Sequence, residues 1–207
     1  MDGINLAGTL LTEHAHVCGF FHTPAEEYDV LMPFVAEGFA QGDRAFHIID
    51  PRLRRDYETV LHDAGVDVEA AEASGQLEIR QWAEGYLRDE TFNQDAMLAL
   101  IQEVLTDGRT RGYPRTRFIA HMEWSLEDFP GVDSIIEYEA RLNQVLPKYH
   151  DPVICTYDLA KFGGGIVVDI LRTHPLAIIG GLLVANPFYV PPEEFLAELR
   201  ARQDVLG

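Results

Sequence analysis

Three side chains that can bind metals or act as nucleophiles alternate near the start of the chain: His14, His16 and Cys18. Alternate residues of a strand point to one face, so a strand here would display imidazole and thiol groups together. Cys155 and Tyr157 repeat this alternation towards the other end of the sequence. Imidazoles and thiols ligate soft metals, and a thiol beside an imidazole can be an activated nucleophile. The spacing leaves open a metal site, a reactive thiol, or the polar anchors of a pocket.

The segments that must position these side chains follow from the distribution of apolar residues. Apolar runs alternate with amphipathic stretches, several of which begin with a capping residue or a first-turn proline. The pattern predicts strands at 16–21, 44–50, 77–82, 117–124 and 152–158, and helices at 24–38, 51–65, 95–108, 134–146, 165–173 and 193–203. Two apolar arms around Gly180-Gly181 predict an antiparallel hairpin over 176–184.

This alternation of strands and helices predicts an α/β fold. We expect a mostly parallel sheet with helices on both faces and the hairpin at its C-terminal edge. No shift in composition divides the 207 residues, so a single domain over 1–207 is expected. The most apolar region, 166–190, is interrupted by charged residues and prolines and predicts buried core rather than a membrane span. The N-terminus lacks the pattern of a secretory signal, which predicts a cytoplasmic protein.

Charge and missing motifs exclude several classes of function. The net charge is −18, with 34 acidic residues against 16 basic ones, and no cluster of lysines and arginines offers a surface for phosphates. Direct nucleic-acid binding is therefore not expected. Neither a P-loop nor the glycine fingerprint of dinucleotide-binding proteins is present. The turn FFHTPAEE, at 20–27, places two carboxylates where a phosphate-binding loop would lie.

Both ends of the chain carry a family resemblance. The stretch HVCGFFHTPAEEYDVLMPFVAEGFAQGDRAFHII, at 16–49, resembles the opening of the MEDS domain, the methanogen/methylotroph, DcmR sensory domain. CTYDLAKF, at 155–162, and LRTHPLAIIGGLLVANPFYVPPEEFL, at 171–196, resemble its closing segment, and the similarity covers about 13–200. The resemblance implies a RecA-like (KaiC-like) core that has lost its ATP-binding loop. It also implies a sensor of hydrocarbon-derived or one-carbon compounds.

Five residues are the expected anchors of a small-molecule ligand: His16, Cys18, Cys155, Tyr157 and His174. In a RecA-like sheet the strand of Cys155 can neighbour the strand of Cys18, which would bring the two thiols together. The competing interpretation is structural: the thiols are buried, His16 is hydrogen-bonded in the core, and His174-Pro175 marks the end of a helix.

Two further questions concern metal and the fourth strand. No cofactor is expected, but His16, Cys18 and Cys155 are candidates for binding zinc or another soft metal. His121 and Glu123 alternate on the fourth predicted strand. A buried carboxylate needs a partner, so they either pair with each other or line the ligand pocket.

We therefore expect a stand-alone sensing and signalling domain rather than an enzyme. It would bind a small ligand in a mostly apolar pocket and act through a signalling protein partner, with no nucleic acid and no membrane involved. A homo-oligomer is compatible with the sequence. Two alternatives stay open: a thiol- or metal-dependent enzyme that uses Cys18 and His16, and a degenerate RecA-like protein that still binds nucleotides.

Overall fold

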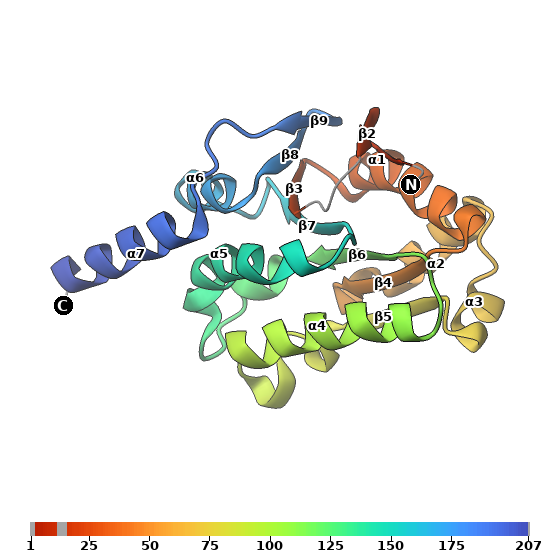
Figure 1. Ribbon diagram of the computed structural model, residues 1–207, viewed down its shortest axis with the longest axis horizontal. Helices are drawn as coiled ribbons and strands as arrows, with labels where there is room; N and C mark the ends of the chain where they lie inside the picture. The colour runs from red at the N-terminus through yellow and green to blue at the C-terminus, as the bar shows by residue number, and fades with distance from the viewer. Residues whose placement is uncertain (1–2, 12–15, 207) are drawn as a thin grey trace.

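The computed structural model describes residues 3–11 and 16–206, and Figure 1 shows the arrangement of its elements. His14 lies outside the described residues. Within them, seven strands form one sheet in the order β5-β4-β6-β7-β3-β8-β9. These strands are β3 (His16–Phe21), β4 (Arg44–Ile49), β5 (Leu77–Gln81), β6 (Thr116–His121), β7 (Val153–Asp158), β8 (Leu176–Ile179) and β9 (Leu182–Ala185). Neighbouring strands are parallel except β8 and β9, so the expected sheet and hairpin are confirmed.

Helices cover both faces of this sheet. They are α1 (Pro24–Gln41), α2 (Arg54–Asp63), α3 (Val68–Ser74), α4 (Gln94–Thr110), α5 (Ile135–Val145), α6 (Gly164–Thr173) and α7 (Pro192–Leu206). Apolar side chains of α4, α5 and α6 form one core with the strands, while those of α1, α2 and α3 form a second core with the other strand residues. Figure 1 shows α4 and α5 side by side along the sheet. The two-faced α/β architecture is as the sequence predicts.

Helix α1 begins where the sequence predicts and ends later. The Thr23 side chain accepts a hydrogen bond from the Glu26 amide at 3.2 Å, and Pro24 occupies the first turn. The helix continues past Gly38, the predicted end, to Gly42, whose φ of 77° terminates it. Gly38 is a packing residue instead, because a Cβ atom there would lie 2.6 Å from the Cδ atom of Arg117. The buried Arg117 side chain therefore explains the glycine.

The fourth predicted strand is too long. Strand β6 ends at His121, and Glu123 begins a short 3₁₀ helix, Glu123–Leu126. The Met122 amide still donates to Thr156 on β7, but the Ser125 hydroxyl then donates to the Met122 carbonyl at 2.9 Å and the chain turns. His121 and Glu123 consequently do not alternate on one strand.

Some short elements escape the sequence pattern. Strands β1 (Ile4–Leu6) and β2 (Thr9–Leu11) form a separate two-stranded sheet, and α3 follows an Asp67 cap. The hydroxyl of Ser134, the first residue of the helix predicted over 134–146, donates to the Gly131 carbonyl at 2.7 Å and does not cap α5. None of the helices in the described parts of the chain is long and apolar enough to cross a bilayer.

Candidate functional site

The centre of the sheet brings together residues from both ends of the chain. Strands β3 and β7 are neighbours, and Cys18 lies opposite Cys155 in their register. Strand β8 lies on the other side of β3, so His174, which follows α6 two residues before β8, reaches the same region. The adjacency expected from a RecA-like strand order is thus present.

A carboxylate that the sequence interpretation missed lies at the middle of this region. Glu139 of α5 is fully buried, and its Oε2 atom lies 3.1 Å from Nε2 of His16 and 3.3 Å from Nε2 of His174. Its Oε1 atom accepts a hydrogen bond from the Tyr157 hydroxyl at 3.1 Å. The thiol of Cys155 lies 3.7 Å from Oε2 and 3.8 Å from Nε2 of His16. We call His16, Glu139, Cys155, Tyr157 and His174 the Glu139 cluster.

The orientation of the His16 ring follows from its other nitrogen. The Asn143 side-chain amide donates to the Glu139 carbonyl at 3.1 Å and to the Thr173 carbonyl at 2.6 Å. Its Oδ1 atom is therefore the acceptor that faces His16 Nδ1 at 3.0 Å. Because an amide oxygen only accepts, the Nδ1 atom of His16 carries the hydrogen. The Nε2 atom that faces Glu139 is then the lone-pair nitrogen of a neutral ring.

His174 is held in the same way. Its Nδ1 atom lies 2.8 Å from the Ile170 carbonyl, which can only accept, so Nδ1 again carries the hydrogen. The centroids of the two imidazole rings lie 4.0 Å apart, and both Nε2 atoms face the same carboxylate oxygen. Asn143 and the Ile170 carbonyl thus fix the tautomers of His16 and His174. The two Nε2 atoms and Oε2 of Glu139 are then three hydrogen-bond acceptors that face one another.

Burial and neighbouring charges set the ionisation of the cluster. Burial, reinforced by the neighbouring His174, lowers the pKa of His16 more than its contacts with Glu139 and Asn143 raise it. Burial alone would raise the pKa of Glu139, but hydrogen bonds and charge from His16 and His174 lower it to about 2, an effect that holds only while a proton or cation lies on the imidazole side of the carboxylate. An ionised carboxylate between two Nε2 lone pairs is repulsive unless a proton or a cation lies among them. The cluster is therefore built to receive a positive charge or a hydrogen-bond donor.

The two thiols are not set up as nucleophiles. Burial raises the pKa of Cys18, and burial together with Glu139 raises that of Cys155 well above its usual range. The Cys18 thiol donates a hydrogen bond to the Leu176 carbonyl at 3.6 Å. The side chains that could bind a metal together with His16 and Cys155 are Glu139 and His174, not Cys18. A low-pKa thiolate beside His16, which the enzyme hypothesis needs, is not what this geometry favours.

His121 and Glu123 lie away from the Glu139 cluster. Nε2 of His121 is 3.0 Å from Oε1 of Glu27, and Glu123 accepts a hydrogen bond from the Asp158 amide at 3.2 Å. The first of the two alternatives, a pairing of His121 with Glu123, is therefore replaced by two other contacts. Both residues line a hollow of about 20 Å³ at the carboxyl ends of the strands, together with Glu27, Asp158 and Lys161. Carboxylates predominate at the place where a RecA-type ATPase would bind phosphates, which disfavours nucleotide binding.

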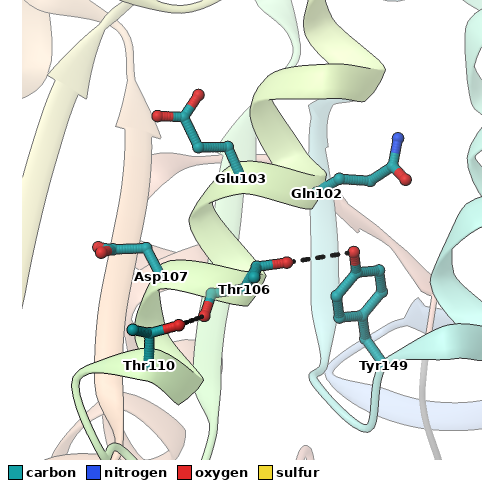
Figure 2. A pocket seen from close by; sticks show the side chains of 6 residues that line it. All are labelled: Gln102, Glu103, Thr106, Asp107, Thr110 and Tyr149. Atoms are coloured by element: carbon teal, nitrogen blue, oxygen red, sulfur yellow. Dashed lines mark hydrogen bonds between the residues drawn. The ribbon is translucent and has the colours of Figure 1, made fainter.

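A larger surface hollow, of about 470 Å³, lies on the outer side of α4 (Figure 2). Polar side chains of α4 and one tyrosine from the segment after α5 line it: Gln102, Glu103, Thr106, Asp107, Thr110 and Tyr149. The hydroxyls of Thr106 and Tyr149 lie 3.4 Å apart across it. Its open polar lining does not suit a small apolar ligand, so the buried cluster remains the better candidate site.

Comparison with known proteins identifies the family. The sequence profile of MEDS, the MEthanogen/methylotroph, DcmR Sensory domain, matches residues 15–175. The chain belongs to the MEDS family. A curated relative, the transcriptional repressor DcmR of Methylorubrum extorquens, is 26% identical over 171 residues, which make up 82% of this chain and 61% of the relative. The chain therefore spans about three fifths of the length of that repressor.

Solved structures confirm the fold of this MEDS domain. A KaiC-like protein of Pyrococcus horikoshii OT3 superposes with a TM-score of 0.54 at 19% identity, covering 80% of this chain and 70% of the other. An uncharacterised protein of Pyrococcus horikoshii, solved in complex with an unknown peptide, gives a TM-score of 0.61 at 15% identity and covers 82% and 78% of the two chains. The expected RecA-like, KaiC-like architecture is confirmed. Family membership supports a role in sensing and signalling, and all five residues of the Glu139 cluster lie within the matched segment.

Proposed function

We propose that this MEDS domain binds a small hydrocarbon-derived or one-carbon compound at the Glu139 cluster and passes the signal to a protein partner. The observation that carries the proposal is the convergence of two imidazole Nε2 atoms on a buried carboxylate. A ligand with a hydroxyl, an ammonium group or a polarised C–H bond supplies the positive end that these acceptors lack. The surroundings are apolar, because Phe20 and Phe162 both pack on the Tyr157 ring.

A route from the cluster to the surface runs through His174. The Asn186 side chain donates to the His174 carbonyl at 2.7 Å and thereby ties the end of β9 to the cluster. Strand β9 forms the edge of the sheet, and its Leu182 and Val184 side chains are exposed. A ligand that prefers one position of His174 would shift the conformation of this edge, which a partner can sense.

A protein partner, rather than DNA, suits the charge of the chain. A net charge of −18 opposes the approach of nucleic-acid phosphates. The related repressor DcmR is longer than the region matched here. In this proposal the MEDS domain supplies ligand recognition, and a protein partner receives the signal.

Isothermal titration of the full chain tests the proposal, with short alcohols, halomethanes and methylamines as the compounds. We expect saturable binding of at least one class. His174→Gln should weaken it by about tenfold or more, since a lost polar contact to a buried group costs about 1–3 kcal/mol. His62→Gln on the exposed surface of α2 is the matched control and should bind normally. Silence from folded protein towards every class, or equal binding by both variants, would refute the proposal.

A further inference from the structure

We infer that the Glu139 cluster is also a metal site, in which His16, Glu139, Cys155 and His174 hold one divalent ion of the Zn²⁺ type. The inference deepens the proposed function and rests on it in placing ligand capture at the same cluster. When bound, the metal takes the place of the ligand's positive end among the converging acceptors, so the metal-free and metal-loaded clusters would bind a ligand differently. Each of the four residues comes from a different element or junction, so the site exists only in the folded sheet.

Four of the six separations between the donor atoms are close to those of a tetrahedral site. Bonds of about 2.0 Å to nitrogen and oxygen and about 2.3 Å to sulfur place neighbouring N and O donors about 3.3 Å apart, and sulfur about 3.6 Å from either. The Oε2 atom of Glu139 lies 3.1 and 3.3 Å from the two Nε2 atoms. The Cys155 sulfur lies 3.7 Å from Oε2 and 3.8 Å from Nε2 of His16. All four donor atoms lie within 4.8 Å of one another.

The outer contacts are those of a metal site. Metal-binding imidazoles commonly donate their second nitrogen to a carbonyl or amide oxygen, which fixes the ring. Here His16 donates to Asn143 and His174 to the Ile170 carbonyl, so both present Nε2 to the centre. The Tyr157 hydroxyl binds Oε1 of Glu139 and leaves Oε2 free for the ion. Nε2 of His174 is fully buried and has no hydrogen-bond partner among the described atoms, which is the expected condition of an unused ligand atom.

Charge and burial agree with this assignment. The four side chains are at most 2% exposed. A divalent ion bound by one carboxylate, one thiolate and two neutral imidazoles has no net charge, so the complete centre can lie in an apolar core at little electrostatic cost. Cys18 lies two residues after His16 on β3, opposite Cys155 on β7. Its thiol donates to the Leu176 carbonyl instead of facing Glu139, so Cys18 provides a matched control.

The experiment uses the full, tag-free chain. Metal analysis after exposure to excess Zn²⁺ and desalting should give one ion per chain, and Co²⁺ in its place should give a thiolate-to-metal charge-transfer band. Cys155→Ser should abolish that band and weaken Zn²⁺ binding in a chelator competition by about tenfold or more. Cys18→Ser should retain both. Substoichiometric zinc in folded wild-type protein, or a band that survives Cys155→Ser, would overturn the inference.

The metal site and the proposed function can fail separately. Zinc content is measured without any organic ligand, so a loaded protein that binds none of the tested compounds supports the metal site and contradicts the sensing proposal. Conversely, a chelator can be used to remove the metal. If the metal-free protein remains folded and binds an alcohol or halomethane with unchanged affinity, the metal has no role in ligand capture.

Discussion

Replacing the central carboxylate with its amide tests the charge argument for the Glu139 cluster. Glu139→Gln preserves the shape of the side chain and removes the negative charge that faces His16 and His174. If a proton or cation lies among these groups, the substitution leaves a buried positive charge without its counter-ion. Breaking a buried ion pair in this way costs about 3–5 kcal/mol. For a chain of this size that corresponds to a fall of about 10 °C in the melting temperature.

The assay is urea unfolding followed by circular dichroism, with Glu137→Gln as the control. Glu137 lies two residues earlier in α5 and is only half-buried, so its substitution should change the free energy of unfolding by less than about 0.5 kcal/mol. The opposite result has a clear meaning. If both imidazoles are neutral and nothing lies between them, the glutamine amide can donate to an Nε2 atom. Glu139→Gln would then be as stable as the control or more stable, and the charge argument would be wrong.

Four other predictions follow from the same structure. Burial lowers the pKa of His121, but the surrounding carboxylates, chiefly Glu27, outweigh this and raise it. The charged His121 therefore stabilises the fold fully below pH 6.5, and this stabilisation is lost as the pH rises through the raised pKa. The difference in unfolding free energy between wild type and His121→Gln should shrink from about pH 6 to about pH 9, and a difference that grows would contradict this. Asp43→Ala leaves Arg117 buried without its 2.8 Å partner and should cost about 3–5 kcal/mol in urea unfolding, whereas a loss below 1 kcal/mol would show that the pair is dispensable. Both cysteines should react with iodoacetamide about 100-fold more slowly in the folded than in the unfolded protein, and fast labelling would restore the nucleophile hypothesis. A fluorescent ATP analogue should not bind, and saturable anisotropy changes would disprove this.

Most strands and helices of the fold could be predicted from the sequence, because each carries its own local pattern of apolar and capping residues. Buried parallel strands such as β7 are continuous apolar runs, and Thr23 with Pro24 marks the start of α1. The short β1–β2 sheet and α3 have too few residues to show a period. Strand β6 was overestimated because apolar residues continue into the buried 3₁₀ turn, where burial is the same but the backbone differs.

The sequence predicts four of the five residues of the Glu139 cluster, His174 among them, and misses Glu139. His16, Cys155 and Tyr157 follow from strand alternation, and strand order brings Cys18 beside Cys155. Glu139 was missed because a glutamate in an amphipathic helix normally lies in solvent. Its position was nevertheless a signal: it lies four residues after Ile135 and three before Leu142, on the buried stripe of α5. An ionisable residue on such a stripe requires a buried partner, and here the partners come from strands that only the tertiary fold brings together.

The protonation of the His16 and His174 ring nitrogens in solution decides most directly whether the Glu139 cluster is a set of converging acceptors. Long-range ¹H–¹⁵N correlation spectra distinguish protonated from unprotonated ring nitrogens, and titration with the alcohols, halomethanes and methylamines shows whether those nitrogens sense a ligand. We expect both residues to carry a hydrogen on Nδ1 and none directly bonded to Nε2, and we expect the Nε2 shifts to move when a compound binds. Protonated Nε2 atoms with bare Nδ1 atoms, unmoved by every compound, would contradict this expectation.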